Sequence, residues 1–173
     1  MPFVKHRRAN LSVQAILQIL SEHGIDPAVC LAGTALKTGD LLDVDTVISD
    51  EAEIRIIEQA LELLPPKAGY GFRSGKTLKP STYGLLGLAI VTSPKVRDAL
   101  TTMTRFADPF LLSKIRLREQ AGKGLMVVDM HSLPVTIQRY VFERVFATFS
   151  TFTAEMMPDF DITTIELHVP FSD

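Results

Sequence analysis

The sequence contains very little cysteine, since Cys30 is the only one among 173 residues. A single thiol excludes both an intrachain disulfide and a thiolate-rich metal site. We therefore expect a protein of the reducing cytoplasm, in which Cys30 is a small buried hydrophobic residue. The histidines are scattered, without the paired spacing that metal ligands use on a helix; they are His6, His23, His131 and His168. The sequence thus predicts neither a metal nor a cofactor.

The chain also lacks an excess of positive charge. Its 18 Lys and Arg residues against 20 Asp and Glu residues give a formal net charge of −2, and the pI is about 6.1. A protein that grips DNA normally presents clustered basic side chains to the phosphate backbone. We therefore do not expect these residues to hold DNA by themselves.

Long hydrophobic runs are missing as well. No uninterrupted apolar stretch approaches the roughly 20 residues of a membrane-spanning helix, and the run at residues 85–91 ends at Thr92-Ser93-Pro94. The basic N-terminus leads into an amphipathic segment instead of the apolar core of a signal peptide. These absences predict a soluble protein without a membrane partner. Hydrophobic residues still make up 46% of the chain, which favours an exposed apolar face.

Two segments of the first third have helical periodicity. One runs from Asn10, a favourable N-cap, to Gly24, a favourable stop, and its buried face comprises Val13, Ile16, Leu17 and Leu20. The other begins at Asp50, which forms a capping-box pattern with Glu53, and its apolar face comprises Ile54, Ile57, Leu61 and Leu64. Between them we expect a short turn at residues 27–31 and a loop at residues 32–43.

The middle of the chain contains many glycines. Glycines at residues 69–75 predict a tight turn. Ser81 is predicted to cap a helix through Val91, in which Gly84 and Gly87 leave a smooth side for close packing. After Ser93-Pro94 a further helix is expected, and its buried stripe comprises Val96, Leu100, Met103 and Phe106.

The last third predicts an antiparallel hairpin and the longest helix. Residues 115–118 and 125–130 have strand patterns around the turn residues 122–124. Residues 134–157 lack an interior glycine or proline, and their apolar face comprises Phe142, Val145, Phe146, Phe149, Phe152 and Met156. Residues 165–169 alternate as a half-buried strand. The predicted class is α+β, a single helix-rich domain over residues 1–173 with a small antiparallel sheet of the hairpin plus the C-terminal strand.

Signals for catalysis are weak. Gly75-Lys76-Thr77 imitates the end of a phosphate-binding loop, but the first glycine of that motif would fall at Tyr70. His131 precedes Ser132, yet nothing in the sequence places an orienting carboxylate or an oxyanion hole. We predict no catalytic residues, and an enzyme that uses His131 or Lys76 stays an alternative.

Three side chains are candidate ligand-binding residues: Arg73, Tyr83 and Arg105. Guanidinium and phenol groups beside apolar helices are well suited to fix a ligand carboxylate. The phenylalanine-rich face of residues 142–156 could line a lipophilic pocket, although an ordinary core is the favoured interpretation.

The order of motifs in residues 69–106 resembles the N-terminal sensor domain of AraC-type bacterial transcriptional regulators, in the group whose domain is labelled arabinose-binding. That family has a Gly-Leu-Arg-x-Gly turn, a Tyr-Gly-x-Leu-Gly helix, a Ser-Pro-Thr-Leu-x-x-Ala-Leu helix and an Arg-Tyr. The matching residues here are 71–75, 83–87, 93–100 and 105–106. Looser similarity extends to residues 24–27 and 165–168. Phe72 replaces the commoner leucine, and Pro170 follows His168 at the second position instead of the third.

The resemblance implies an effector-sensing and dimerisation domain that controls DNA binding through a C-terminal helix-turn-helix domain with no counterpart in these residues. The implied partners are a small-molecule effector of unknown class, a second copy in a homodimer, and DNA only through that missing domain. It further implies a cytoplasmic regulator and not an enzyme. The alternative is a dimerisation or interaction module without an effector.

Overall fold

The computed structural model describes residues 8–42, 46–67, 69–106, 110–120 and 123–156. The α+β class is confirmed, because within these residues helices dominate and the strands form two short antiparallel pairs. The elements in chain order are β1 (Arg8–Ala9), α1 (Leu11–Glu22), α2 (Ala28–Leu31), the 3₁₀ helix η1 (Thr38–Leu42), β2 (Val47–Ile48), α3 (Asp50–Leu63), α4 (Tyr70–Thr77), the 3₁₀ helix η2 (Pro80–Tyr83), α5 (Gly84–Val91), α6 (Val96–Phe106), β3 (Lys114–Gln120), β4 (Lys123–Asp129) and α7 (Val135–Met156).

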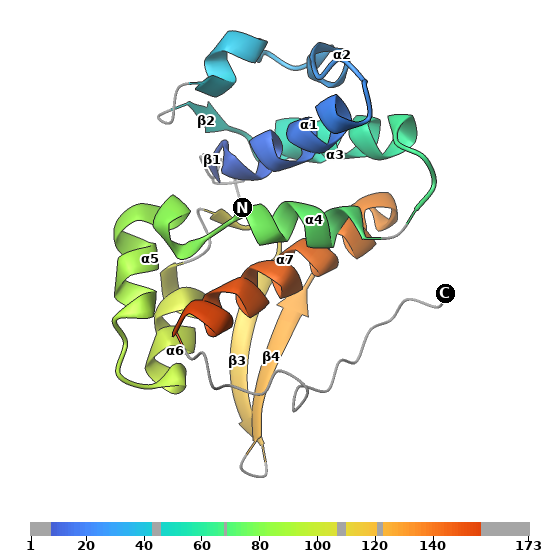
Figure 1. Cartoon of the computed structure of the whole chain (residues 1–173). Coiled ribbons are helices and arrows are strands. Elements are labelled where there is room, and N and C mark those ends of the chain that lie inside the picture. Colours follow the sequence, from blue (N-terminus) through green and yellow to red (C-terminus); the bar gives the residue numbers. More distant parts are fainter. Residues whose placement is uncertain (1–7, 43–45, 68, 107–109, 121–122, 157–173) are drawn as a thin grey trace, which may run out of the picture.

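The elements are layered around α4 and α7, which lie side by side across the middle of the molecule (Figure 1). On one side of this pair lie α1 and α3, with α2 and β2 beyond them. On the other side the β3–β4 hairpin extends away from the body, while α5 and α6 flank the end of α7. The main core joins buried residues of α1, α3 and α7, and a smaller apolar cluster joins Ile90, Ala99 and Phe152 of α5, α6 and α7.

The first predicted helix is confirmed as α1. Gly24 adopts a positive φ of 74°, and the next N–H, of Ile25, donates to the Leu20 carbonyl at 3.0 Å, a helix-ending bond that leaves the helix with few unpaired carbonyls. Asn10 occupies the N-cap position without capping through its side chain. Its amide instead donates to the Leu41 carbonyl at 3.1 Å. Cys30 is fully buried and free, as predicted.

The predicted capping box of α3 is wrong by one residue. Ser49 is the N-cap, and its hydroxyl accepts a hydrogen bond from the Ala52 N–H at 3.2 Å. Asp50 is therefore the first helical residue. The predicted capping box gave Glu53 the role of a capping side chain in the first turn of α3. Instead, Glu53 is only 1% exposed and faces the protein interior. An ionic partner far along the chain overrides the local capping preference.

The predicted glycine turn is also wrong, because residues 70–77 form the helix α4. Gly71 and Gly75 lie one turn apart and face α7, where added Cβ atoms would come within 2.2 Å of the Tyr140 carbonyl oxygen and 2.4 Å of the Arg144 carbonyl oxygen. The glycines thus allow two helix backbones to approach closely. At the start of α4, the Glu143 carboxylate accepts hydrogen bonds from the Gly69 and Gly71 N–H groups at 3.2 Å. This supplies partners for N–H groups that a helix start leaves free.

The helix expected from Ser81 to Val91 is divided in two. Pro80 begins the 3₁₀ helix η2, and α5 begins only at Gly84, whose φ is 54°. The predicted smooth side exists at Gly87, where an added Cβ would meet the Pro80 carbonyl oxygen at 1.7 Å, but not at Gly84, which has open space. The chain therefore folds back tightly on itself before α5.

The hairpin and the longest helix are confirmed as β3–β4 and α7. The hairpin pairs Lys114 with Asp129 through Gln120 with Lys123. The predicted apolar face of α7 is buried in part: Val145 and Phe152 are each 4% exposed, whereas Phe142, Phe146 and Phe149 are half-buried. The charged residues Glu143 and Arg144 are as deeply buried, at 6% and 1% exposed. The predicted C-terminal strand at residues 165–169 lies outside the described residues. The pair β1–β2 and the 3₁₀ helix η1 were not predicted, because both are very short.

Candidate ligand-binding site

A cleft of about 430 Å³ opens between the chain that follows α2 and the start of α3. Its walls are residues 33–36 and 47–49 together with Glu51, Ala52 and Arg55 of α3. Ligand-binding pockets usually have volumes of about 300–1,000 Å³. The cleft is therefore large enough for a small metabolite.

Local hydrogen bonds fix the shape of the cleft. The Thr34 hydroxyl donates to the Leu31 carbonyl at 2.7 Å and accepts from the Leu36 N–H at 3.3 Å. Ser49 caps α3 at the opposite wall. Next to it, β2 pairs with β1, so that Ile48 lies opposite Arg8 and Val47 opposite Ala9. Both walls are held by the chain's own bonds, which favours a preformed site.

Arg55 supplies the positive charge in the cleft. An added Cβ at Gly33 would lie 2.6 Å from Nη2 and 2.9 Å from Cζ of Arg55, so the guanidinium lies directly against the backbone of Gly33. Gly33 also has a φ of 76°, a conformation in which a side chain is strained. A side chain at residue 33 would thus displace the guanidinium from this position. Glu51, one turn earlier on α3, supplies a negative charge on the same wall.

A second set of polar groups is buried where α1, α3 and α7 meet. Arg144 and Glu53 form an ion pair at 3.0 Å between Nη1 and Oε1, with side-chain exposures of 2% and 1%. The Ser12 hydroxyl donates to the same Oε1 at 2.7 Å. The other terminal nitrogen of Arg144, Nη2, is buried without a hydrogen-bond partner. A buried charge is costly unless it is paired, so separating these side chains would destabilise the protein. The cluster therefore links α1, α3 and α7.

Two tyrosines lie near the buried arginine. The Tyr140 hydroxyl donates to Ser74 Oγ at 2.8 Å, and the Arg144 guanidinium carbon lies 5.5 Å from the centre of the Tyr140 ring. Burial raises the pKa of Tyr83 to about 12, although the charge of Arg144 and a hydrogen bond with Thr148 act in the opposite direction. Both phenols therefore stay neutral at physiological pH and serve as packing and hydrogen-bonding groups.

Comparison with known proteins identifies the family. The family model described as the arabinose-binding domain of AraC transcription regulators, N-terminal, matches residues 24–172. The chain belongs to this family. Two curated relatives are HTH-type transcriptional regulators, described as uncharacterised, of Mycobacterium tuberculosis and Mycobacterium bovis. Each is 31% identical over 144 residues, which cover 83% of this chain and 42% of the relative. The AraC-type domain described here thus spans less than half the length of these regulators.

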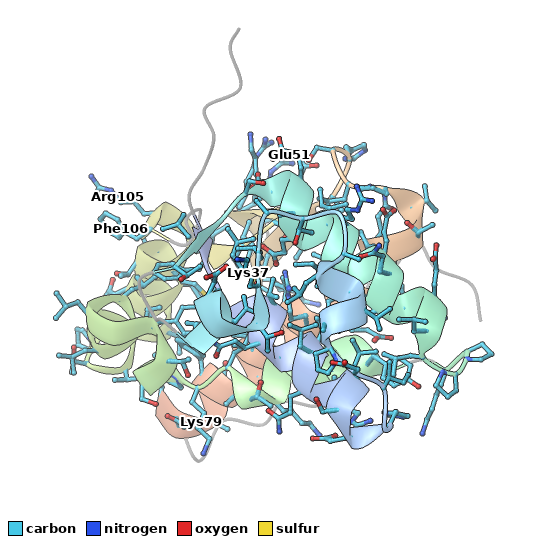
Figure 2. The ribbon with its side chains drawn as sticks, turned by 90° about the horizontal axis from the view of Figure 1, so that it is seen from above. Lys37, Glu51, Lys79, Arg105 and Phe106 are labelled. Atoms are coloured by element: carbon cyan, nitrogen blue, oxygen red, sulfur yellow. The ribbon has the colours of Figure 1, made fainter. Side chains whose placement is uncertain are left out.

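The AraC-type domain does not bring the three predicted site residues together. Arg73 forms an ion pair with Glu22 of α1, and both side chains are nearly half exposed. Arg105 lies at the end of α6 with its guanidinium 5.4 Å from the Phe106 ring, and Figure 2 shows both side chains at the edge of the molecule. Tyr83 packs edge-on against the rings of Phe110 and Phe152, each at 5.3 Å. Each candidate therefore has a different set of neighbours.

The residues that gave the weak catalytic signals lie in two separate parts of this domain. The side chain of His131 is 98% exposed and contacts Asp129 at 2.9 Å. Gly75, Lys76 and Thr77 complete α4, so they do not form a phosphate-binding loop. Among the residues that the structure describes, no three His, Cys, Asp or Glu side chains gather where they could hold a metal ion. Within the same residues, no helix has the length and apolar character needed to cross a membrane.

Sequence reasoning missed the residues that line the cleft. Glu51 and Arg55 look like ordinary surface charges of an amphipathic helix, and Gly33 looks like an ordinary loop glycine. Only the fold places Gly33 beside Arg55. A charged pair one turn apart on the polar face of a helix is the one signal in the sequence that could have directed attention there.

Proposed function

We propose that this AraC-type domain senses a small-molecule effector in the cleft, and that binding controls DNA attachment by a helix-turn-helix domain of the full-length cytoplasmic regulator. The observation that carries the proposal is a cleft of metabolite size whose walls are internally braced. The family description supports the binding of a small molecule, and the names of the relatives support a role in transcription regulation. Binding would act by favouring one of two states of the regulator.

Filling the cleft should abolish the response to an effector. Ala35 lines the cleft and is exposed, so Ala35→Trp should occupy the space without disturbing the core. We expect a compound from a panel of sugars, amino acids, organic acids and fatty acids to stabilise the unmodified domain. At one hundred times its Kd the gain is about 2.7 kcal/mol, roughly 5–11 °C in Tm. The Ala35→Trp variant should show no such shift in thermal unfolding.

The matched control is Ala28→Trp, which adds the same side chain to an exposed position of α2 outside the cleft. This variant should respond as the unmodified domain does. An effector that stabilises Ala35→Trp fully would place the binding site elsewhere. A panel without any response would count against effector sensing and favour the module without an effector.

Self-association is the second function that we propose, and α5 is the surface that favours it. The sequence of α5 is entirely apolar, yet Leu85 is 85% exposed and Leu88 is 56% exposed. Neighbouring apolar side chains exposed in this way are typical of contact surfaces. We propose that a second copy of this domain covers them, in keeping with the dimerisation expected of the regulator.

The variant Leu85→Glu should weaken the dimer. Burial of a leucine contributes about 1.5–3 kcal/mol, so we expect its loss to raise the dimer Kd at least roughly tenfold, as measured by sedimentation velocity over a concentration series. Val135 is 82% exposed at the start of α7, and this end of α7 lies on the opposite side of the molecule from α5 (Figure 1). Val135→Glu is therefore the control and should leave association unchanged. An unmodified domain that stays monomeric at high concentration would refute the proposal.

A further inference from the structure

The cleft carries one positive and one negative side chain for which the described part of the chain supplies no partner. Arg55 and Glu51 both line it, and the structure records neither a hydrogen bond nor an ion pair for either side chain within the described residues. Figure 2 places Glu51 at the start of α3. Side chains four residues apart on a helix are neighbours, with Cβ atoms roughly 5–6 Å apart. One small molecule could therefore contact both charges.

The other polar side chains of the cleft are already occupied. The Thr34 hydroxyl bonds to the backbone of its own turn, and the Ser49 hydroxyl caps α3. The rest of the lining is apolar, from Leu36 and Ala35 on one wall to Val47 and Ile48 on the other. A ligand in the cleft would thus meet one guanidinium, one carboxylate and an apolar surface.

The guanidinium of Arg55 lies against Gly33, within 3 Å of the position that a side chain at residue 33 would take. A planar guanidinium can form two parallel hydrogen bonds to a carboxylate, which a lysine ammonium cannot match. This favours a carboxylate as the group that Arg55 recognises. A carboxylate alone would lie close to the negative charge of Glu51.

We infer that the cleft binds a free α-amino acid with an apolar side chain, and this inference rests on the proposed function. The ligand carboxylate pairs with Arg55, its ammonium group pairs with Glu51, and its side chain contacts the apolar wall. An α-amino acid fits because its two charges are adjacent and of opposite sign, as are those of the cleft wall. Its net charge of zero matches a lining in which one positive side chain balances one negative side chain.

Calorimetric titration with three matched compounds tests this inference. The probes are L-leucine, 4-methylpentanoate, which lacks the ammonium group, and 3-methylbutylamine, which lacks the carboxylate. We expect L-leucine to bind at least tenfold more tightly than either analogue. L-valine and L-phenylalanine, titrated alongside, cover smaller and larger apolar side chains. If none of the three amino acids binds, or if either analogue matches L-leucine, the inference is wrong.

Two variants assign the charges. Arg55→Gln should weaken the binding of L-leucine at least tenfold, and L-leucine should then bind no more tightly than 3-methylbutylamine. In Glu51→Gln, L-leucine should bind no more tightly than 4-methylpentanoate. Lys76→Gln, which removes an exposed charge outside the cleft, should leave binding unchanged. If L-leucine affinity is the same in Arg55→Gln as in the unmodified domain, Arg55 is not the carboxylate anchor and the inference fails.

The proposed function and this inference can fail separately. A sugar or fatty acid whose stabilising effect is lost in Ala35→Trp would preserve effector sensing in the cleft and overturn the assignment to amino acids. The absence of any response in the whole panel would overturn both.

Discussion

Replacing Arg144 by methionine is expected to lower the free energy of unfolding by about 3–5 kcal/mol, because the substitution leaves the Glu53 carboxylate buried without its ionic partner. Ser12 would still donate one hydrogen bond to that carboxylate, but a neutral hydroxyl does not balance a charge. The loss should appear as a lower midpoint in urea unfolding followed by circular dichroism. It should have little effect on the shape of the cleft, which Arg144 does not line.

Two controls isolate the buried pair. Arg73→Met breaks the ion pair with Glu22, whose side chains are nearly half exposed, and should cost no more than about 1 kcal/mol. The double variant Glu53→Leu/Arg144→Met removes both charges and should recover most of the stability, since an apolar replacement of a buried pair is often neutral. If Arg144→Met cost no more than Arg73→Met, the buried pair would not be the link between α3 and α7 that the structure indicates.

Adding a single methyl group to the glycine face of α4 is the second change with a large expected effect. In Gly71→Ala the new Cβ would lie 2.2 Å from the Tyr140 carbonyl oxygen, and in Gly75→Ala it would lie 2.4 Å from the Arg144 carbonyl oxygen. Backbone atoms cannot rotate away, so α4 and α7 must separate. Overpacking typically costs about 1–3 kcal/mol, and we expect each variant to lose at least about 2 kcal/mol even though alanine favours a helix by about 1 kcal/mol.

The control for this prediction is Gly39→Ala, because nothing lies within 4 Å of the Cβ that it would add and its φ is not positive. The free energy of unfolding of this variant should equal or exceed that of the unmodified domain. If Gly71→Ala and Gly75→Ala were as stable as Gly39→Ala, the close approach of α4 and α7 would not be a feature of the folded protein.

These two predictions concern features that local sequence patterns do not reveal. The helices α1, α3 and α7 were predictable because their apolar residues recur at helical spacing, and the hairpin because its residues alternate. The helix α4 was not, since glycines favour turns when nothing else is known. What stabilises α4 is the backbone of α7 and the carboxylate of Glu143, more than 60 residues away in the sequence.

The candidate site was harder to predict than the fold. Arg73, Tyr83 and Arg105 were chosen for their chemistry, which says nothing about the neighbours that the fold gives them. Glu53 was assigned to a helix cap, because its distant partner Arg144 is invisible in a local pattern. The family could be identified from the order of its motifs, but most of these residues are glycines, caps and core positions. Such residues determine the fold but do not indicate which ligand binds.

The most direct test of effector binding in the cleft is to locate the effector on the domain by NMR. The compound from the panel that raises Tm most would be added to ¹⁵N-labelled protein, and the amide shifts would be followed residue by residue. We expect the largest changes at residues 33–36 and 47–55, around the cleft. If the changes were confined to α5, α6 and the end of α7, with the cleft amides unmoved, the effector would bind outside the cleft and the proposed site would be wrong.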